Sequence, residues 1–453
     1  MTQAILDEAA QTAYGTYVNP QWVRLLNLLE MNAQYDSCLG TELLTSDGRT
    51  ILDFLSGFCV YNAGHNHPAI IAALKDELDK NGPSMLQSHV PELAGIAAKR
   101  LCELSGKQLS RVVFCSSGSE GVEAVIKFAR AHTKRPGLLY CDGAFHGLTC
   151  GALSLMGDET WKKGFGPLLP GTEAIPFNDL AALEAKLATR KFAAFIVEPI
   201  QAEAGIKLPQ GNYLKEVQRL CRSYGTLFVL DEVQTGVFRT GPFLAAHHFG
   251  VEPDMVVLAK ALSGGLIPVG AVLMTQKISE SVYSSLSRAG IHTSTFGENS
   301  LAMRAVLATL DVLEGEGIVQ GSIARGDEFR RNLKEALAPY EMFKAVRGFG
   351  MFTGIEWREP QKLLLRMPFE AFKRIHPAMF GQVLVMRMFR DKGIIAQICG
   401  NEFMVLKAVP PLVTTKEQLD HYVRSIAEVA HEAHTSEGFW AEAIGMMRRT
   451  LNV

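Results

Sequence analysis

The sequence predicts an α/β fold, with a large domain built around a mostly parallel central sheet and a smaller α+β domain. Between about residues 60 and 295, continuous apolar runs of four to six residues alternate with stretches of helical character. This pattern is typical of parallel strands that are buried on both faces. Beyond this region the strand-like runs become shorter and lie between helical segments, which predicts a separate mixed domain. A chain of 453 residues is long enough to bury more than one core.

The elements of the large domain follow from the spacing of apolar residues. Residues 90–105 carry apolar residues at helical spacing. Residues 111–132 predict a short strand, a loop of small residues and then an amphipathic helix. Three further strands are predicted by the apolar runs in KFAAFIVEP (191–199), GTLFVLDEV (225–233) and PDMVVLAKA (253–261).

The smaller domain is predicted from the C-terminal third of the chain. The pattern there indicates two helices, short strands and a closing helix, within 298–317, 328–340, 345–357, 404–412 and 416–435. We therefore expect residues 61–310 to form the large domain and residues 311–453 to form the small domain. An N-terminal segment, residues 1–60, is expected to contribute to the small domain.

Composition argues against several classes of partner. The 45 basic and 47 acidic residues give a formal net charge of -2, which offers no basic surface to nucleic acid or to an anionic membrane. The N-terminal sequence MTQAILDEAAQTAYG lacks a basic segment and an apolar run, and no stretch approaches the roughly 18 apolar residues of a spanning helix. The eight cysteines are scattered without metal-ligand spacing. We expect a cytoplasmic protein without signal peptide, membrane anchor or bound metal.

Polar residues stand where predicted strands end. Asp231 closes the run LFVLD, and Lys260 follows the run VVLA. Ligands bind outside the carboxyl ends of the strands in open α/β sheets, so both side chains can project into one crevice. A third element, CSSGSE (115–120), opens a helix, and its backbone N–H groups and helix dipole form a cradle for phosphate. Each feature alone also has an ordinary explanation, as a helix cap, a solvated lysine or a turn.

Pyridoxal phosphate is a ligand that needs a phosphate cradle, an amine and a carboxylate in one crevice. Its aldehyde condenses with a lysine amine that desolvation keeps partly deprotonated, which suits Lys260. A carboxylate such as Asp231 beside the ring nitrogen keeps that nitrogen protonated, so that the ring draws electrons from the substrate. Phe145, in GAFHG, is the candidate aromatic residue over the ring, or else an ordinary core residue.

Several motifs in fixed order resemble those of the class III aminotransferases, which include ornithine, acetylornithine, 4-aminobutyrate and putrescine aminotransferases. The motifs are SSGSEGVEA, GAFHG, VEPIQAEAG, LDEVQTGVFRTG, PDMVVLAKALSGG and HTSTFGEN. The resemblance covers nearly the whole chain and implies a fold-type I transferase that depends on pyridoxal phosphate. Among these enzymes, putrescine aminotransferase is the most similar, through YVNPQW, LDFLSGFCVYNAGHNHP and GPLLPG.

The resemblance implies a role for each matching residue. Lys260 would bind the cofactor covalently and act as the acid/base of the proton shift, Asp231 would pair with the ring nitrogen, and Gln234 would reach the ring hydroxyl. Thr295 would contact the phosphate from the neighbouring subunit, which implies a homodimer with shared active sites. The cofactor-binding set is Lys260, Asp231, Gln234, Gly118, Ser119, Ser117, Phe145, His146, Thr295 and Glu198, with Gly118 and Ser119 at the phosphate.

The implied substrate residues are Glu203, Lys407, Phe58 and Tyr61. In relatives that handle amino acids, an arginine before P-P-L grips the substrate α-carboxylate or pairs with the second glutamate of the E-P-I-Q segment. Here Lys407 stands at that position, and a lysine lacks the planar, two-pronged donor that matches a carboxylate. We therefore expect a Glu203–Lys407 pair and a terminal amine as donor; the alternative is that Lys407 grips 2-oxoglutarate.

Residues 359–393 are longer and more apolar than their counterpart in most relatives. Their methionines and phenylalanines could line a pocket for a long hydrophobic amine or aldehyde. A packing element over the small domain is the favoured interpretation.

The expected enzyme moves an amino group from a diamine or ω-amino compound to a 2-oxo acid, with pyridoxamine phosphate formed between two half-reactions. An acetylornithine- or ornithine-type aminotransferase and an aminotransferase for long-chain amines are the alternatives within the family. An aminomutase and a cofactor-binding regulatory protein without turnover are more distant alternatives.

Overall fold

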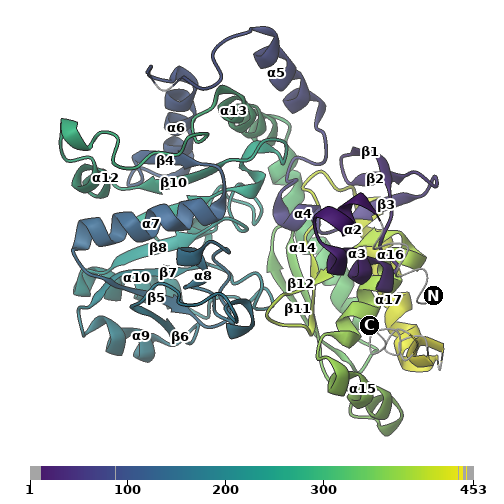
Figure 1. The fold of residues 1–453 in the computed structure, drawn as a ribbon. Helices are drawn as coiled ribbons and strands as arrows, with labels where there is room; N and C mark the ends of the chain where they lie inside the picture. Colours follow the sequence, from purple (N-terminus) through teal and green to yellow (C-terminus); the bar gives the residue numbers. More distant parts are fainter. Residues whose placement is uncertain (1–11, 87, 437, 442–444, 446–453) are drawn as a thin grey trace.

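The computed structural model describes residues 12–86, 88–436, 438–441 and 445. The first eleven residues, which include most of the segment that led us to expect no signal peptide, lie outside the described residues. The described part contains one seven-stranded sheet and two four-stranded sheets. The seven-stranded sheet with its helices lies on the left in Figure 1, and the smaller sheets lie on the right.

The seven-stranded sheet is mostly parallel, as the sequence predicts. Its strands run in the order β4 (Arg111–Cys115), β10 (Gly270–Met274), β9 (Met255–Leu258), β8 (Leu227–Asp231), β7 (Phe192–Val197), β5 (Gly137–Cys141) and β6 (Thr172–Ile175). The strands from β9 to β6 pair in parallel, whereas β10 is antiparallel to both of its neighbours. A parallel pair needs a crossover of about a dozen residues or more. The short connection from β9 to β10 contains only a 3₁₀ turn, so the chain returns antiparallel.

The central sheet is buried on both faces. Val229 and Val257 belong to the same apolar cluster as Val125 of α7 (Gly118–Thr133). Phe228 belongs with Val217 of α10 (Tyr213–Tyr224) in the other large cluster. Successive residues of a strand point to opposite faces, so α7 and α10 cover opposite sides of the sheet.

The remaining helices complete this half of the molecule. They are α5 (Pro68–Asp79), α6 (Glu92–Ser105), α8 (Cys150–Leu153), α9 (Leu180–Leu187), α11 (Ala246–Phe249), α12 (Gln276–Val282) and α13 (Ser300–Gly315), with 3₁₀ turns η1 (Glu159–Trp161), η2 (Lys260–Ser263) and η3 (Leu286–Arg288). Helix α6 matches the helix predicted within 90–105, and α13 matches the one predicted within 298–317.

Two smaller sheets bring the ends of the chain together. One has the order β1 (Tyr35–Leu39), β2 (Glu42–Thr45), β3 (Thr50–Asp53), β13 (Ile394–Ile395), and the other has the order β11 (Phe343–Phe349), β12 (Phe352–Trp357), β15 (Val405–Ala408), β14 (Gln397–Ile398). Strand β13 pairs in parallel with β3, so residues before 60 share a sheet with residues after 311. The division of the chain at residues 60 and 310 stays a prediction.

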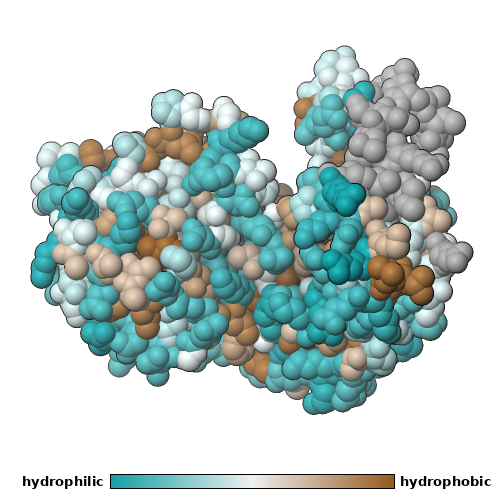
Figure 2. Space-filling model, turned by 90° about the horizontal axis from the view of Figure 1, so that it is seen from below, coloured by the Kyte–Doolittle hydropathy of each residue, from teal (hydrophilic) through white to brown (hydrophobic). Residues whose placement is uncertain are grey.

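The helices of this half are α2 (Ala13–Tyr17), α3 (Pro20–Leu28), α4 (Ser56–Cys59), α14 (Ile318–Leu337), α15 (Leu363–Ile375), α16 (Met379–Lys392) and α17 (Lys416–Thr435). Figure 2 shows the molecule from below, with a largely hydrophilic surface and separate hydrophobic patches. Within the described residues, none of the helices combines the length and the apolar character that crossing a bilayer requires.

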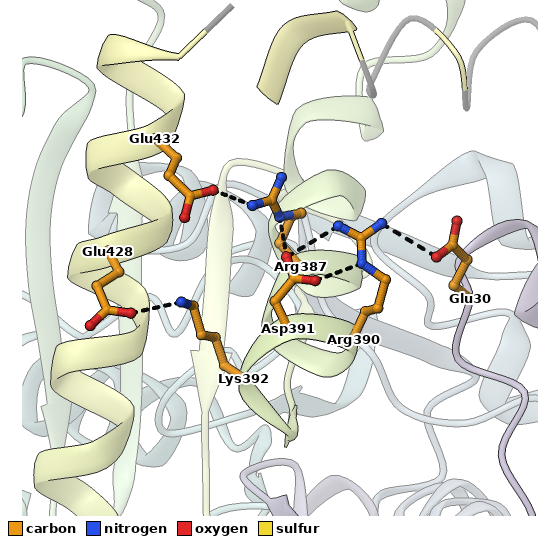
Figure 3. Close-up of polar contacts among 7 residues, drawn as sticks. All are labelled: Glu30, Arg387, Arg390, Asp391, Lys392, Glu428 and Glu432. Atoms are coloured by element: carbon orange, nitrogen blue, oxygen red, sulfur yellow. Dashed lines mark hydrogen bonds and ion pairs between the residues drawn. The ribbon is translucent and has the colours of Figure 1, made fainter. Parts of the chain in front are cut away.

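Residues 359–393 form α15 and α16 and pack against the small sheets. Val383 and Leu384 of α16 are fully buried in the main apolar cluster. On its polar side, α16 is joined to α17 and to the N-terminal segment by ion pairs (Figure 3), which are Arg387–Glu432, Lys392–Glu428 at 2.6 Å and Arg390–Glu30 at 3.3 Å. These contacts support the packing interpretation of the segment.

Candidate active site

A cavity of about 410 Å³ lies where β8 and β9 end. This volume suits a small organic ligand. The expected cofactor-binding residues that line it are Ser117, Gly118, Ser119, Phe145, His146, Glu198, Asp231, Gln234 and Lys260. The structure thus brings together all of that set except Thr295.

Lys260 is the first residue of η2, directly after β9. Its backbone has φ +50°, an uncommon conformation for a residue with a side chain, and such strain concentrates at functional sites. Burial lowers the pKa of the Lys260 ammonium below its ordinary value, and this effect outweighs the nearby carboxylates. A larger fraction of neutral amine, able to attack a carbonyl, follows from this shift.

Asp231 and His146 form a buried pair. His146 Nδ1 lies 2.8 Å from Asp231 Oδ2, and Val233 N donates to Asp231 Oδ1 at 3.1 Å. Burial opposes protonation of His146, but the hydrogen bond and the charge of Asp231 outweigh it, so the pKa of His146 lies above its ordinary value. With a proton on Nδ1, His146 donates to Asp231 and fixes the orientation of the carboxylate.

The loop before α7 forms a concave surface with free backbone donors. Ser117 is the N-cap of α7, and its side chain accepts a hydrogen bond from Glu120 N. The first N–H groups of a helix have no acceptor within it, so those of Gly118 and Ser119 are free to bind an anion. A Cβ on Gly118 would lie 2.9 Å from Val233 Cγ2, and one on Gly147 would lie 2.3 Å from Ser119 Oγ. Glycine is therefore required at both positions for this close packing.

Glu198 is buried beside the cavity and holds the loop that carries Phe145. Its carboxylate accepts hydrogen bonds from Phe145 N at 3.0 Å and Ala202 N at 2.9 Å. Burial raises the pKa of Glu198 to about 7. The ring of Phe145 meets Trp161 edge to face, with centroids 5.4 Å apart.

Glu203 and Lys407 form the pair that the sequence predicts. Lys407 Nζ donates to Oε1 and Oε2 of Glu203, at 2.7 and 2.9 Å. Gly400 N and Gln234 Nε2 also donate to this carboxylate, at 2.7 and 3.2 Å. Phe58 covers the ammonium, with Lys407 Nζ 4.9 Å from its ring centroid. Gln234 therefore connects the cavity to the Glu203–Lys407 pair.

Five expected site residues do not line the first cavity, which are Glu203, Lys407, Phe58, Thr295 and Tyr61. Thr295 lines a second cavity, together with His292 and Asn299, and its contact with a cofactor of the neighbouring subunit stays a prediction. The ring of Tyr61 stacks on His65 at a centroid distance of 3.8 Å and lies behind Gly265, which lines the cavity. Val60, the preceding residue, lines the cavity instead.

The sequence-based reasoning missed part of the cavity wall. Val60 and the run 266–269 (LIPV) line it, and the position of this run directly after KALSGG was the available signal. It also missed a bridge in which Trp161 Nε1 donates to Asn401 Oδ1, and Asn401 Nδ2 donates to Gly143 O, both at 2.9 Å. No local pattern links Trp161 to a partner 240 positions away. No described residue of 359–393 lines the cavity, which argues against the pocket interpretation of that segment.

The residues around the cavity fit pyridoxal phosphate. The first turn of α7 offers free N–H groups for a phosphate, Lys260 offers an amine of lowered pKa for an aldehyde, and Asp231 offers a carboxylate for a ring nitrogen. In addition, the buried Nε2 of His146 has no hydrogen-bond partner among the described residues, so the pocket has an unused polar group. The parallel sheet and this site together define a fold-type I, pyridoxal-phosphate-dependent enzyme.

The chain belongs to the class III aminotransferases, because the family model "Aminotransferase class-III" matches residues 28–430. It is therefore a pyridoxal-phosphate-dependent transaminase. It is 33% identical to Aminotransferase PigE of Serratia sp. over 93% of this chain, and it spans about half, 53%, of that protein. It is 36% identical to ornithine aminotransferase of Halalkalibacterium halodurans, over 85% of this chain and 91% of that one.

Solved structures give the same result. The structure of ornithine aminotransferase from Toxoplasma gondii matches with a TM-score of 0.79 and 30% identity, over 89% of this chain and 90% of that chain. Acetylornithine aminotransferase from Elizabethkingia anophelis matches with a TM-score of 0.70 and 30% identity, over 88% of this chain and 94% of that chain.

Proposed function

We propose that this aminotransferase takes its amino group from a terminal amine, such as a diamine or an ω-amino compound, and gives it to a 2-oxo acid. The observation that carries the proposal is the Glu203–Lys407 pair. Lys407 is 1% exposed, its charge is balanced by Glu203, and Phe58 lies over it. No arginine among the described residues lines the cavity. A donor without an α-carboxylate suits a site with this charge distribution.

The chain's own residues have distinct parts in the proposed reaction. When bound, pyridoxal phosphate supplies an aldehyde that takes up the amino group and a ring that accepts electrons. Lys260 Nζ accepts the proton that leaves the amine-bearing carbon of the donor, as its lowered pKa favours. Asp231, oriented by His146, would stabilise positive charge on the ring nitrogen, and Phe145 would pack against the ring.

The acceptor needs a cation for its carboxylate. Lys407 would supply this charge if Glu203 released it, whereas the intact pair presents no net charge to the donor. As a point charge, an ammonium binds a carboxylate with less directional preference than a guanidinium. We therefore expect acceptors of several lengths to be used.

An ornithine-type enzyme is the second candidate. It is supported by the similarity to ornithine aminotransferase, at 36% identity over 91% of that protein, and by the structural match at a TM-score of 0.79. The reacting δ-amine of ornithine is itself a terminal amine, so the Glu203–Lys407 pair is compatible with it. What distinguishes the two candidates is whether the donor's α-carboxylate contributes to binding.

The deciding experiment measures kcat/KM for putrescine, 4-aminobutyrate and ornithine with 2-oxoglutarate as the common acceptor. Comparable or higher values for putrescine support a terminal amine recognised without a carboxylate. A strong preference for ornithine would contradict the primary proposal and establish the second. Lys260→Ala, assayed in parallel, corrects for turnover by contaminating enzymes.

We propose a homodimer in which Thr295 completes the partner's site. Thr295 does not line its own chain's cofactor cavity, and the segment that carries it has exposed apolar residues, which are Phe296 at 60%, Ile291 at 51% and Leu286 at 93%. Mixing Lys260→Ala and Thr295→Ala subunits tests the arrangement. If sites are shared, each mixed dimer has one intact site, and roughly a quarter of wild-type activity returns. If Thr295 serves its own chain, no activity returns.

We propose a cytoplasmic location, supported by the cysteines. Every one of the eight cysteines is a free thiol in the structure, as a reducing compartment favours. Cell fractionation followed by immunoblotting tests this; detection in an oxidising compartment would contradict it.

A further inference from the structure

Arg239 is a completely buried arginine in the middle of the loop between β8 and α11. It is 0% exposed, and no ion pair joins it to a carboxylate among the described residues. Its guanidinium instead donates to neutral acceptors. These are Met351 O and Ser56 Oγ, each at 3.2 Å, together with Pro410 O and Asn62 Oδ1.

An unpaired buried guanidinium is costly, because burial favours the neutral form and lowers the pKa of Arg239. The guanidinium group is, however, rigid and planar, so its N–H donors can bind several acceptors in fixed directions at once. The acceptors of Arg239 come from three separate parts of the chain. They lie in residues 56–62, in the turn between β11 and β12, and directly after β15.

The first of these parts, residues 56–62, begins in a left-handed conformation. Ser56, Phe58 and Cys59 have φ values of +45°, +61° and +68°, which disfavour residues with side chains. Such a conformation persists only where the surroundings enforce it. Residues 56–62 therefore need fixed partners outside the segment.

Those partners include Arg239. Ser56 Oγ accepts from Arg239 and donates to Val409 O at 2.6 Å. Asn62 accepts from Arg239 and donates through Nδ2 to Val237 O at 2.7 Å. Both ends of residues 56–62 are thus hydrogen-bonded to the guanidinium of Arg239. In addition, Ser56 is bonded to Val409 and Asn62 is bonded to Val237.

Residues 56–62 carry part of the site described above. Val60 lines the cavity, and Phe58 lies over Lys407. Lys407 belongs to β15, only three positions before Pro410, which also accepts from Arg239. The same guanidinium therefore contacts the segment that bears Phe58 and the strand end that bears Lys407, although Arg239 itself does not line the cavity.

We propose that Arg239 is a positioning residue of the substrate site: it fixes residues 56–62 against the end of β15, so that Phe58 stays over Lys407 and Val60 stays in the cavity wall. The inference rests on the proposed function, in which the Glu203–Lys407 pair beneath Phe58 decides the class of donor. It predicts that changes at Arg239 alter the choice of donor, and not merely the amount of folded enzyme.

The experiment compares wild type, Arg239→Lys and Arg239→Met with Arg325→Met. Arg325 is a matched control, because its Nη2 donates to Leu412 O at 2.7 Å, in the same stretch after β15, while no hydrogen bond joins it to residues 56–62. The two fastest donors of the wild-type panel are used with purified holoenzyme. Rates are expressed per bound cofactor, so that loss of folded enzyme does not affect them.

We expect Arg239→Lys to raise KM for both donors and to change the ratio of their kcat/KM values by roughly tenfold, with a larger change for Arg239→Met. Arg325→Met should lower Tm and leave this ratio unchanged. A wild-type ratio in both Arg239 variants, with only Tm reduced, would overturn the proposal.

If the Arg239 variants do not fold, Asn62→Ala decides the question. It removes one acceptor from residues 56–62 and leaves Met351 O and Pro410 O in place. A changed donor ratio supports the proposal, and an unchanged ratio contradicts it. The wild-type panel tests the donor class separately, so a failure of the proposed function alters only which two donors are compared.

Discussion

The ammonium of Lys407 lies between the two carboxylate oxygens of Glu203, 2.7 and 2.9 Å away, in the interior of the protein. Burial opposes ionisation of both groups, but their mutual attraction outweighs it. The pKa of Glu203 therefore lies below its ordinary value and that of Lys407 above it. The pair stays charged throughout the neutral pH range, so neither residue can be removed without leaving a buried, uncompensated charge.

Lys407→Met should therefore reduce the free energy of unfolding by about 3–5 kcal/mol, as the loss of one partner of a buried pair does. Urea unfolding measures the change. Lys334→Met, on an exposed part of α14, is the control and should have little effect. The double variant Glu203→Gln/Lys407→Met should recover most of the loss, because no unpaired charge remains. A loss below about 1 kcal/mol for Lys407→Met would show that Glu203 finds another partner.

Lys407→Arg should improve recognition of carboxylates. A guanidinium presents two parallel donors to a carboxylate, so KM for 2-oxoglutarate should fall by roughly three- to tenfold. The kcat/KM value for ornithine should rise relative to that for putrescine. Steady-state kinetics with both donors measures the effect, and equal changes for both donors would count against it.

His146→Ala should weaken the binding of pyridoxal phosphate by roughly ten- to a hundredfold, since loss of a hydrogen bond to a charged group costs about 1.5–3 kcal/mol. The physical reason is that Asp231 loses the group that orients it. Cofactor fluorescence titration gives the dissociation constant. The control is His248→Ala, whose ring bonds to Thr240 O outside the cavity, and its affinity should match wild type.

Glu198 should make stability fall as pH rises. Burial raises its pKa to about 7, so the folded protein holds a proton that the unfolded chain releases near pH 4.3. The unfolded state binds fewer protons in this window, and the free energy of unfolding therefore decreases between about pH 4.3 and pH 7. Glu198→Gln removes this contribution.

The measurement is Tm of the apoprotein at pH 5 and at pH 8. Relative to wild type, Glu198→Gln should gain stability at pH 8 compared with pH 5. Glu232, whose pKa burial also raises to about 7, retains its own contribution in both proteins. If Tm depends on pH in the same way in the two proteins, the pKa of Glu198 is the same in the folded and unfolded states, which contradicts the prediction.

Gly147→Ala should disrupt the cofactor cavity. The added Cβ would lie 2.3 Å from Ser119 Oγ, at a residue with φ +119°. Ser119, in the first turn of α7, must shift together with its backbone N–H group, and the affinity for pyridoxal phosphate should drop by roughly tenfold or more. Gly95→Ala, in α6 with no atom within 4 Å of its Cβ, should instead stabilise the protein by about 0.5–1 kcal/mol. Equal cofactor affinity in the two variants would count against the cradle.

The parts of the fold that depend on local pattern could be predicted from the sequence. Continuous apolar runs placed β7, β8 and β9 correctly, and the strand ends placed Asp231 and Lys260 at one cavity. The antiparallel direction of β10 was not predicted, because strand direction depends on the length of the connection and not on apolar periodicity.

The parts of the site that depend on distant contacts could not be predicted in this way. Tyr61 was expected at the substrate; its ring stacks on His65 and lies against Gly265 of the cavity wall, so this role stays a prediction. The acceptors of Arg239 lie up to 183 positions away and are uncharged, so neither charge pattern nor spacing reveals them. The Glu203–Lys407 pair is also distant, and it was predicted only through the family resemblance.

The pairing of β3 with β13 has a consequence for how the protein is made. Asp53 bonds into a sheet with Ile395, so the outer edge of β3 has no permanent neighbour until the ribosome has added more than three hundred residues. At typical translation speeds of about 5–20 residues per second, that wait is on the order of half a minute. During this time the edge of β3 offers unpaired backbone N–H and C=O groups. A chaperone can bind this edge, and a strand of another nascent chain can pair with it incorrectly.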